Sequence, residues 1–195
     1  MTEDLQHDPI AWFTAWLDDA YRDDPLANAC ALATAEPDGA PSVRMVLLKG
    51  HDRRGFVFFT NLGSRKGREL AANPRAALCF HVRDRRRQVR VAGPVTPVEP
   101  YEADAYFATR ARDSQLAAWA SRQSQPMASR EVLEAAVAEV TARFEGQTVP
   151  RPPFWSGFRI APERIEFWED VPYRLHRRWA FAPEGDGWAV HELQP

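Results

Sequence analysis

The chain has 195 residues and a formal net charge of −2 at pH 7, with 45% hydrophobic and 27% charged residues. This length and composition predict one globular domain over residues 1–195, large enough to bury a sizeable core. The near-neutral charge argues against a general nucleic-acid-binding protein, and no apolar run approaches the roughly 20 residues of a membrane-spanning helix.

The first half of the chain is predicted to alternate between helices and strands. Asp8-Pro9, followed by apolar residues at helical spacing, predicts a helix over 8–23, and a shorter helix fits 64–72. Short apolar runs separated by turn residues predict strands at 29–35, 42–49, 56–60, 76–82 and 88–98. Hairpins are expected to link the first three strands, and residues 83–87 to form the turn between the last two. Such a meander is long enough to curl into a barrel.

The second half is predicted to contain a helical insert followed by further strands. Apolar spacings of three and four predict helices at 99–109, 114–121 and 129–144. Strand patterns return at 154–160, 164–169, 173–181 and 188–193. The closing strands must complete the sheet begun by the first five. The predicted class is therefore mainly β with helices (α+β).

Three groups of side chains are candidate anion sites. Gly63-Ser-Arg-Lys-Gly67 opens a helix, and free N–H groups together with Arg65 and Lys66 suit a phosphate. Tyr106 and Arg110 share a helix face, with Ser114 as the expected N-cap of the next helix. A period of two places Arg174, His176 and Arg178 on one strand face. The alternatives are a solvated first turn, a tyrosine packed in the core and a solvent-facing strand.

The two lysines, together with the absence of several catalytic motifs, limit the reactions that the sequence predicts. Only Lys49 and Lys66 among the 25 cationic residues are lysines. Some binding sites require a compact ammonium group whose pKa can shift, so these two lysines are candidate site residues. The alternative is that two lysines remain by chance. No nucleophile elbow, dinucleotide-binding or P-loop motif is present, and the histidines lack metal-ligand spacing, so we expect no metal. The pattern favours two phosphorylated ligands over acyl or phosphoryl transfer.

The cysteines and the N-terminus favour a cytoplasmic protein. Cys30 and Cys79 each lie in an apolar strand-like run without a C-x-x-C pair, and we expect both to be buried and reduced. The N-terminal residues are acidic and polar, whereas an export signal needs a cationic start and an apolar run.

Several segments, in order and spacing, resemble the pyridoxamine 5′-phosphate oxidase family. They are Ser42–Lys49, Phe58–Lys66, Arg86–Arg90, Arg112–Ser124, Phe154–Arg159, Ile165–Trp168 and Arg174–His176. The resemblance runs from about residue 8 to 195 and implies an FMN-binding split β-barrel that works as a homodimer with the flavin at the subunit interface. It also implies oxidation of pyridoxamine 5′-phosphate or pyridoxine 5′-phosphate to pyridoxal 5′-phosphate, with dioxygen as acceptor and hydrogen peroxide as product.

The resemblance also implies roles for individual residues. The implied FMN contacts are Arg44, Met45, Val46, Leu47, Leu48, Lys49, Phe59, Thr60, Arg65, Lys66, Gln88, Gln123, Ser124, Trp168 and Arg178. The implied substrate contacts are Lys49, Tyr106, Arg110, Ser114, Arg174, Leu175 and His176. Arg174 and His176 would hold the pyridine ring over the flavin, and Lys49 would polarise the substrate or the flavin edge, which makes these three the candidate catalytic residues.

Three features depart from the family pattern. Many members have a longer N-terminal arm that closes over the substrate, and we expect that lid to be absent here. Phe59 replaces a common tyrosine, which removes a hydroxyl but keeps a ring. Arg177 replaces an acidic residue that usually follows Arg-Leu-His, and we expect an altered surface pair.

Other functions remain open. A split-barrel flavin oxidase of a tricyclic, phenazine-type intermediate is one, although it has no need of the cradle formed by Tyr106, Arg110 and Ser114. A non-catalytic protein that binds FMN or pyridoxal phosphate is another. RNA binding through residues 83–90 is a third, but a charged hairpin turn explains that run, and we expect neither a nucleic-acid nor a membrane partner.

Overall fold

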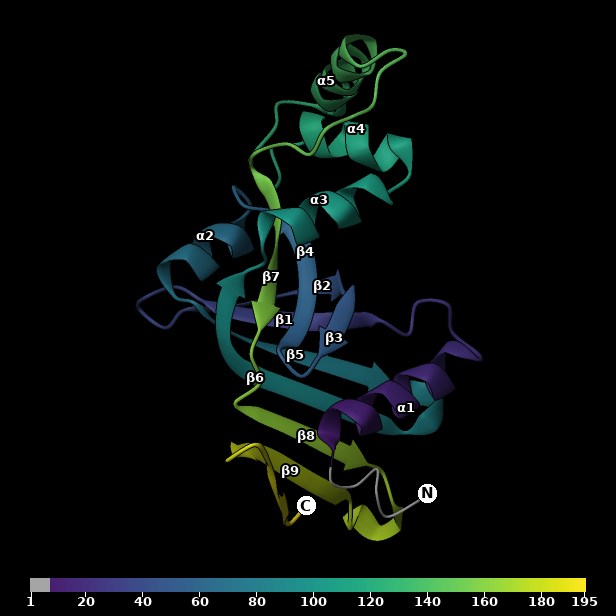
Figure 1. Cartoon of the computed structure of the whole chain (residues 1–195), viewed down its shortest axis with the longest axis vertical. Coiled ribbons are helices and arrows are strands. Elements are labelled where there is room, and N and C mark those ends of the chain that lie inside the picture. Colours follow the sequence, from purple (N-terminus) through teal and green to yellow (C-terminus); the bar gives the residue numbers. More distant parts are fainter. Residues whose placement is uncertain (1–7) are drawn as a thin grey trace.

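The structure is a computed structural model that describes residues 8–195, and the polar segment that bears on export lies outside this range (Figure 1). Its helices are α1 (Pro9–Tyr21), α2 (Arg65–Ala72), α3 (Pro100–Ala108), α4 (Arg112–Ala120) and α5 (Arg130–Arg143). Its strands are β1 (Ala29–Ala35), β2 (Pro41–Leu47), β3 (Gly50–Asp52), β4 (Gly55–Asn61), β5 (Arg75–Val82), β6 (Arg87–Pro97), β7 (Trp155–Ile160), β8 (Arg164–Glu169), β9 (Arg177–Glu184) and β10 (Gly187–Glu192). The predicted α+β class, with an N-terminal helix and a helical insert, is confirmed.

The strands form a curled antiparallel sheet. Its order is β10-β9-β8-β6-β5-β1-β2, and β7 joins β6 to β4. The long strand β6 makes this possible: its first part pairs with β5 and β8, whereas Val95–Pro97 pair with β7. Gly93 lies beside the bend, where an added Cβ would come within 1.9 Å of the Ala161 carbonyl oxygen. The late strands therefore complete the sheet begun by the early ones, as predicted.

The curl stays open between β2 and β4. These strands do not pair with each other; β2 pairs with β1, and β4 pairs with β3 and β7. Beyond the end of β2, the Lys49 N–H donates to the Val57 carbonyl, 2.8 Å away. The sheet is therefore a barrel with a seam.

Because of this seam, the predicted hairpin between the second and third strands is wrong. We expected a hairpin from 42–49 directly into 56–60, but the short strand β3 forms the hairpin with β4 instead. The physical reason is the crossing at Leu48, which is buried and whose N–H donates to the Asn28 carbonyl. The chain thus leaves one part of the sheet before it enters the next.

Two further predictions that concern candidate site residues are wrong. The strand expected over 173–181 begins only at Arg177, because Tyr173 and Arg174 adopt φ values of 62° and 63°, which extended strands do not allow. The alternation that placed Arg174, His176 and Arg178 on one strand face therefore does not apply. Ser114 is not an N-cap: α4 begins at Arg112 after Ala111, so Ser114 lies in the first turn.

The main core lies between α1 and the curled sheet. Asp8 caps α1 by accepting the N–H groups of Ile10 and Ala11, and the helix buries its apolar face. Trp12 stacks on Phe167 of β8 with ring centroids 4.2 Å apart. Figure 1 shows α1 lying across the sheet, with α3, α4 and α5 projecting from the end opposite β9. Among the described residues, no helix is long and apolar enough to cross a membrane.

The two cysteines are not equivalent. Cys30 is buried in the main core, and burial raises the pKa of its thiol to about 12. Cys79 is only half-buried, so the prediction of two buried thiols holds for Cys30 alone. Both are unpaired.

A second, smaller core holds the helical insert against the sheet. It consists of Phe107, Leu116, Phe144, Val149 and Trp155. Because Trp155 belongs to β7 and Leu116 to α4, this cluster sets the position of α4 relative to the end of β4. The insert thereby borders the seam.

Candidate functional site

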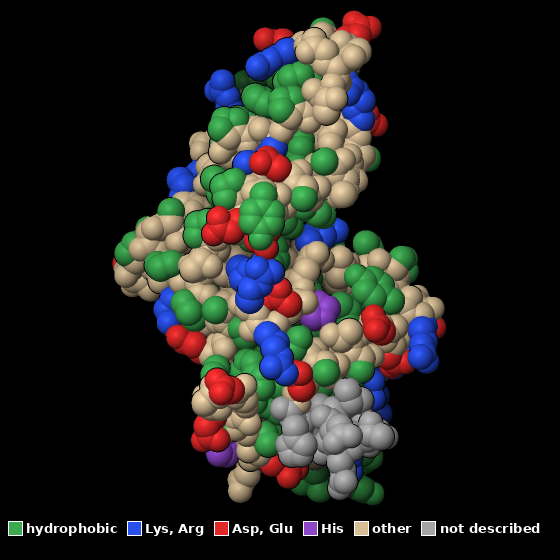
Figure 2. All heavy atoms as spheres, in the orientation of Figure 1, with side chains coloured by type: hydrophobic (Ala, Val, Ile, Leu, Met, Phe, Trp, Pro, Cys, Tyr) green, Lys and Arg blue, Asp and Glu red, His purple; other side chains and the backbone are tan. Residues whose placement is uncertain are grey.

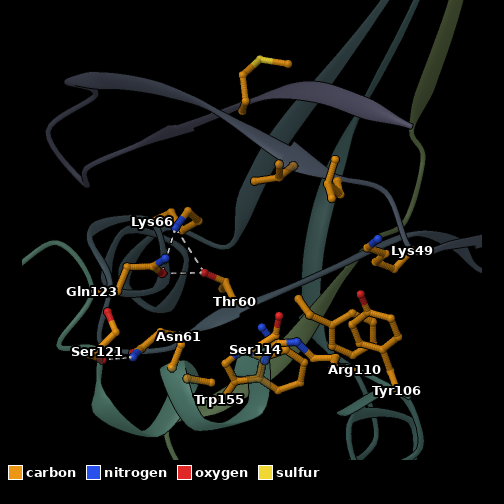
Figure 3. A pocket seen from close by; sticks show the side chains of 16 residues that line it. Lys49, Thr60, Asn61, Lys66, Tyr106, Arg110, Ser114, Ser121, Gln123 and Trp155 are labelled. Carbon is orange, nitrogen blue, oxygen red and sulfur yellow. Dashed lines mark hydrogen bonds between the residues drawn. The ribbon is translucent and has the colours of Figure 1, made fainter. Parts of the chain in front are cut away.

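A cavity of about 420 Å³ opens at the seam between β2 and β4 and is bordered by α3 and α4. Its lining includes many of the predicted residues, namely Met45, Val46, Leu47, Lys49, Phe59, Thr60, Lys66, Tyr106, Arg110, Ser114 and Gln123. Figure 3 shows Lys66, Thr60 and Gln123 together at one end, with Lys49, Tyr106 and Arg110 toward the other. Each end carries cationic side chains.

Lys66 occupies one end, in the first turn of α2. Its Nζ lies 3.2 Å from Thr60 Oγ1, 3.3 Å from Gln123 Oε1 and 3.4 Å from Ser64 Oγ. These partners are neutral oxygens, and the residue is only 9% exposed. Burial lowers the pKa of Lys66, and the nearby charge of Arg44 adds to this effect. A desolvated ammonium with neutral partners favours an incoming anion.

Glu69 explains why two predicted cationic residues do not line the cavity. Arg44 Nη2 lies 2.9 Å from Glu69 Oε2, and Arg65 Nε lies 2.8 Å from Oε1. Burial alone would raise the pKa of Glu69, but hydrogen bonds from Thr34, Arg44 and Arg65 outweigh it and the pKa is lowered. Sequence reasoning missed Glu69, although its position four residues after Arg65 was a signal.

Aromatic rings form the other end. The Phe59 ring lies nearly parallel to those of Tyr106, with centroids 4.2 Å apart, and Trp155, with centroids 5.4 Å apart. The Arg110 guanidinium lies 4.9 Å from the centroid of the Trp155 ring. Lys49 Nζ is 5.9 Å from the centroid of Tyr106. Trp155 lies in the family-like segment Phe154–Arg159, but the sequence alone predicts no role for it.

Arg110 carries the clearest sign of an anion-binding position. Its Nη1 is buried and has no hydrogen-bond partner among the described residues. Burial lowers the pKa of Arg110, partly offset by Tyr106. Buried polar groups in native proteins are normally paired, so an unpaired guanidinium nitrogen beside a cavity marks an anion position. Ser114 lines the same cavity.

A second group of predicted residues lies elsewhere in the fold. Sheet register places Gln88 opposite Trp168, and Trp168 opposite Arg178. The His176 ring lies 4.7 Å from that of Trp168, and Arg178 Nη2 lies 2.8 Å from the buried carboxylate of Glu166. None of these residues lines the seam cavity. Figure 1 shows β8 and β9 at the end of the molecule away from α3 and α4.

The remaining predicted residues are scattered. Leu48 is buried in the core, Leu175 is 65% exposed, and Ser124 lies after α4 in a left-handed conformation with φ of 68°. Arg174 is exposed in the turn before β9. A single described chain therefore brings only part of the predicted site together.

The arginine-rich turn between β5 and β6 is largely neutralised by ion pairs. Arg85 pairs with Asp19 and Asp23, Arg87 with Asp19 and Glu169, Arg86 with Asp170, and Arg90 with Glu166. On the face seen in Figure 2, basic and acidic side chains are interleaved. These pairs leave the turn with little excess positive charge, in keeping with the charged-hairpin interpretation.

Comparisons with known proteins bear on the family of this chain. A model of the family described as pyridoxamine 5′-phosphate oxidase matches residues 17–144, and one described as pyridoxine 5′-phosphate oxidase C-terminal dimerisation region matches residues 155–195. A pyridoxine/pyridoxamine 5′-phosphate oxidase from Sphingopyxis alaskensis is 58% identical, over 100% of this chain and 91% of that protein. A protein of the same name from Anaeromyxobacter dehalogenans is 60% identical over 96% of each.

A solved structure extends the match to the fold. PhzG from Burkholderia lata 383, in complex with tetrahydrophenazine-1-carboxylic acid, is 34% identical, with a TM-score of 0.91 over 100% of this chain and 98% of that chain. The predicted family and its split-barrel fold are thus confirmed. Because two family models and relatives of more than half identity cover the chain from end to end, it belongs to the pyridoxamine 5′-phosphate oxidase family.

Proposed function

We propose that this protein is an FMN-dependent oxidase that converts pyridoxamine 5′-phosphate and pyridoxine 5′-phosphate to pyridoxal 5′-phosphate, reducing dioxygen to hydrogen peroxide. Relatives of 58% and 60% identity carry the name of this activity. The observation that carries the proposal is the buried Arg110 Nη1, which has no partner within residues 8–195 and shares a cavity with the separate Lys66 ammonium. A phosphorylated cofactor and a phosphorylated substrate require two such cations.

The Lys66 end fits the phosphate of FMN. Its ammonium is buried among neutral oxygens of Thr60, Ser64 and Gln123, and an anion would complete its coordination. Met45, Val46 and Leu47 on β2 supply the wall along which the rest of the cofactor would lie. When bound, FMN supplies the hydride acceptor for the C4′ carbon of the substrate and the route of the electrons to dioxygen.

The Arg110 end fits the phosphate of the substrate. Arg110 and Ser114 supply donors, and the Tyr106 hydroxyl belongs to the same lining. The stack of Phe59, Tyr106 and Trp155 holds the guanidinium in place from one side. In this assignment Lys49 lies at the substrate end of the cavity, beside Tyr106, and the protein contributes orientation and charge.

The active enzyme is a homodimer in this proposal. Gln88, Trp168, His176 and Arg178 do not line the seam cavity of their own chain, and a second copy would supply them. The matched C-terminal dimerisation region, residues 155–195, contains three of these four residues. Arg174 and His176 would then orient the pyridine ring at the partner's cavity.

An exposed apolar surface gives this dimer an interface. On β2, Val43 is 69%, Met45 66% and Leu47 39% exposed. Beside them runs a groove lined by small side chains, including Ala31, Ala33, Ala77, Cys79 and Ala92. Large side chains next to a groove can pair with the same surface of a second copy, as a two-fold axis requires.

The experiment is a direct assay of the purified protein. Its visible spectrum reports bound flavin, and an oxygen electrode with a peroxide assay reports turnover of pyridoxamine 5′-phosphate and pyridoxine 5′-phosphate. We expect steady oxygen consumption and equal hydrogen peroxide formation with these substrates. Flavin binding without any peroxide would instead support a non-catalytic binding protein.

The second candidate is oxidation of a tricyclic substrate. It is favoured by the likeness to PhzG, whose structure contains tetrahydrophenazine-1-carboxylic acid. That compound has no phosphate to occupy the Arg110 end. Turnover of that compound, with none of the phosphorylated substrates, would overturn the first proposal in favour of the second.

A further inference from the structure

Asp170, the residue after β8, lies between the side chains of His176 and Arg86. Its Oδ1 is 2.9 Å from Nδ1 of His176, and its Oδ2 is 2.6 Å from Nη2 of Arg86. The Asp170 N–H also donates to the Arg86 carbonyl, 2.9 Å away. Both the Asp170 carboxylate and the His176 ring are mostly buried. Neither Asp170 nor Arg86 has a role in the proposed reaction so far.

The contact constrains the protonation of His176. A carboxylate and an unprotonated ring nitrogen are both acceptors and repel at 2.9 Å, so Nδ1 must carry the proton. The approach falls outside the geometry of a well-aligned hydrogen bond, since Nδ1 is buried without such a partner among the described residues. Hydrogen bonds that orient catalytic groups are often poorly aligned in free enzymes and tighten with substrate.

The segment between Asp170 and His176 needs such an anchor. Tyr173 and Arg174 are consecutive non-glycine residues in the left-handed region, with φ of 62° and 63°. L-residues adopt this conformation only at an energetic cost, and Tyr173 is 92% exposed, so it contributes little packing. Asp170 and His176 are the two ends of this turn, and their contact closes it. Trp168 supports the other side of the His176 ring.

Arg86 links this turn to a firmly held part of the fold. It lies in the β5–β6 turn, whose neighbouring arginines Arg85 and Arg87 pair with Asp19 of α1. Arg87 also pairs with Glu169, the residue before Asp170. The arginine-rich run therefore fixes the position of the Asp170 carboxylate.

We propose that Asp170 is a positioning residue for His176, holding the imidazole with its proton on Nδ1 and leaving Nε2 as the acceptor toward the substrate, while Arg86 holds Asp170. This inference rests on the proposed function, in which His176 contacts the substrate. It gives the arginine-rich turn a role in the oxidase site.

The sharpest test is Asp170→Asn in the FMN-loaded dimer. Arg86 donates to one oxygen of Asp170, so the new amide would turn its oxygen to Arg86 and its NH₂ to Nδ1 of His176. A donor facing Nδ1 would force the proton to Nε2. We expect kcat to fall about tenfold with KM for pyridoxamine 5′-phosphate nearly unchanged, because the phosphate contacts remain.

Matched variants separate positioning from folding. Asp170→Glu keeps the charge and should retain most of kcat, and Arg86→Ala should lower kcat less than Asp170→Asn does. Asp186→Asn is the control, since Asp186 lies in the β9–β10 turn and makes no ion pair within residues 8–195. FMN content should be the same in all four variants.

The ring nitrogens of His176 give a readout independent of activity. Their ¹⁵N chemical shifts should report a proton on Nδ1 in the wild type and on Nε2 in Asp170→Asn. Unchanged shifts together with wild-type kcat in that variant would overturn the inference. If the wild type fails to oxidise the phosphorylated substrates, the proposed function is wrong, while the shifts still decide whether Asp170 sets the tautomer.

Discussion

Arg110 offers the most direct prediction for a single residue. Arg110→Ala should raise KM for pyridoxamine 5′-phosphate about ten- to a hundredfold, because a charge-assisted contact is worth roughly 1.5–3 kcal/mol. FMN content should not change, since Lys66 lies at the other end of the cavity. Steady-state kinetics and the flavin absorbance measure the two effects.

Arg130→Ala is the matched control for this variant. Arg130 lies on α5 and is exposed, so its loss should leave KM unaltered. Loss of flavin from Arg110→Ala with normal substrate affinity would contradict the assignment of this end to substrate.

Replacing Lys66 should weaken cofactor binding but stabilise the protein without cofactor. Lys66→Met should weaken FMN binding about ten- to a hundredfold, again from a loss of roughly 1.5–3 kcal/mol. The apoprotein, however, should melt at a higher temperature, because a buried ammonium whose hydrogen-bond partners within residues 8–195 are all neutral is costly. Titration with FMN and thermal unfolding of the apoprotein measure these effects.

Arg65 and Arg68 serve as comparisons on the same helix. Arg65→Ala should weaken FMN binding less, since its side chain is 56% exposed and its guanidinium already pairs with Glu69. Arg68→Ala removes an exposed cation and should have no effect on binding. If Lys66→Met retains full FMN affinity, the phosphate site is not at α2.

At the scale of elements, His51 couples α1 to β3. Its Nε2 lies 2.8 Å from Thr14 Oγ1, and its ring contacts Phe13 and Phe56. Burial lowers the pKa of His51, and the nearby Asp18 and Asp52 only partly oppose this shift. The unfolded chain, with a histidine pKa of about 6.5, therefore binds the proton more tightly than the folded protein does.

The resulting prediction is a loss of stability on acidification. As pH falls through about 6.5 toward the lower folded pKa, His51 should destabilise the fold, and above that range its effect should vanish. His51→Gln should show a smaller decrease in melting temperature between about pH 8 and pH 5.5. His191→Gln, at an exposed position of β10, should follow the wild type. Equal pH slopes for wild type and His51→Gln would contradict this.

At the scale of the whole molecule, the second copy should be required for a complete site. Val43→Asp places a charge on the exposed apolar surface of β2, where burial against a partner would be costly. Sedimentation should show a species near 22.1 kDa for this variant, and twice that mass for the wild type. The variant should also bind FMN more weakly, since Gln88, Trp168 and Arg178 would no longer reach the cavity.

Val132→Asp provides the control for this prediction. Val132 is a similarly exposed apolar residue, 56% accessible, but lies on α5 away from the sheet. It should leave both the dimer and FMN binding intact. A Val43→Asp monomer with full activity would show that one chain contains a sufficient site.

The sequence by itself determined those features that depend on neighbours along the chain. The cap at Asp8 and Pro9 started α1 as predicted, and the strands predicted at 29–35 and 164–169 are β1 and β8 with the same bounds. Local hydrogen bonding and the alternation of apolar residues decide such elements. The scarcity of lysine likewise singled out Lys49 and Lys66, both of which line the cavity.

Only the tertiary structure decided which distant groups meet. The seam between β2 and β4, the left-handed turn at Tyr173 and Arg174, and the pairing of Asp170 with His176 depend on how the sheet curls. Arg44 and Arg65 show the same dependence on tertiary structure. Both guanidinium groups pair with the buried Glu69, and neither residue lines the cavity. A charge pairs with the partner that folding brings within a few ångströms, and the strength of that pairing depends on burial, which no local pattern records.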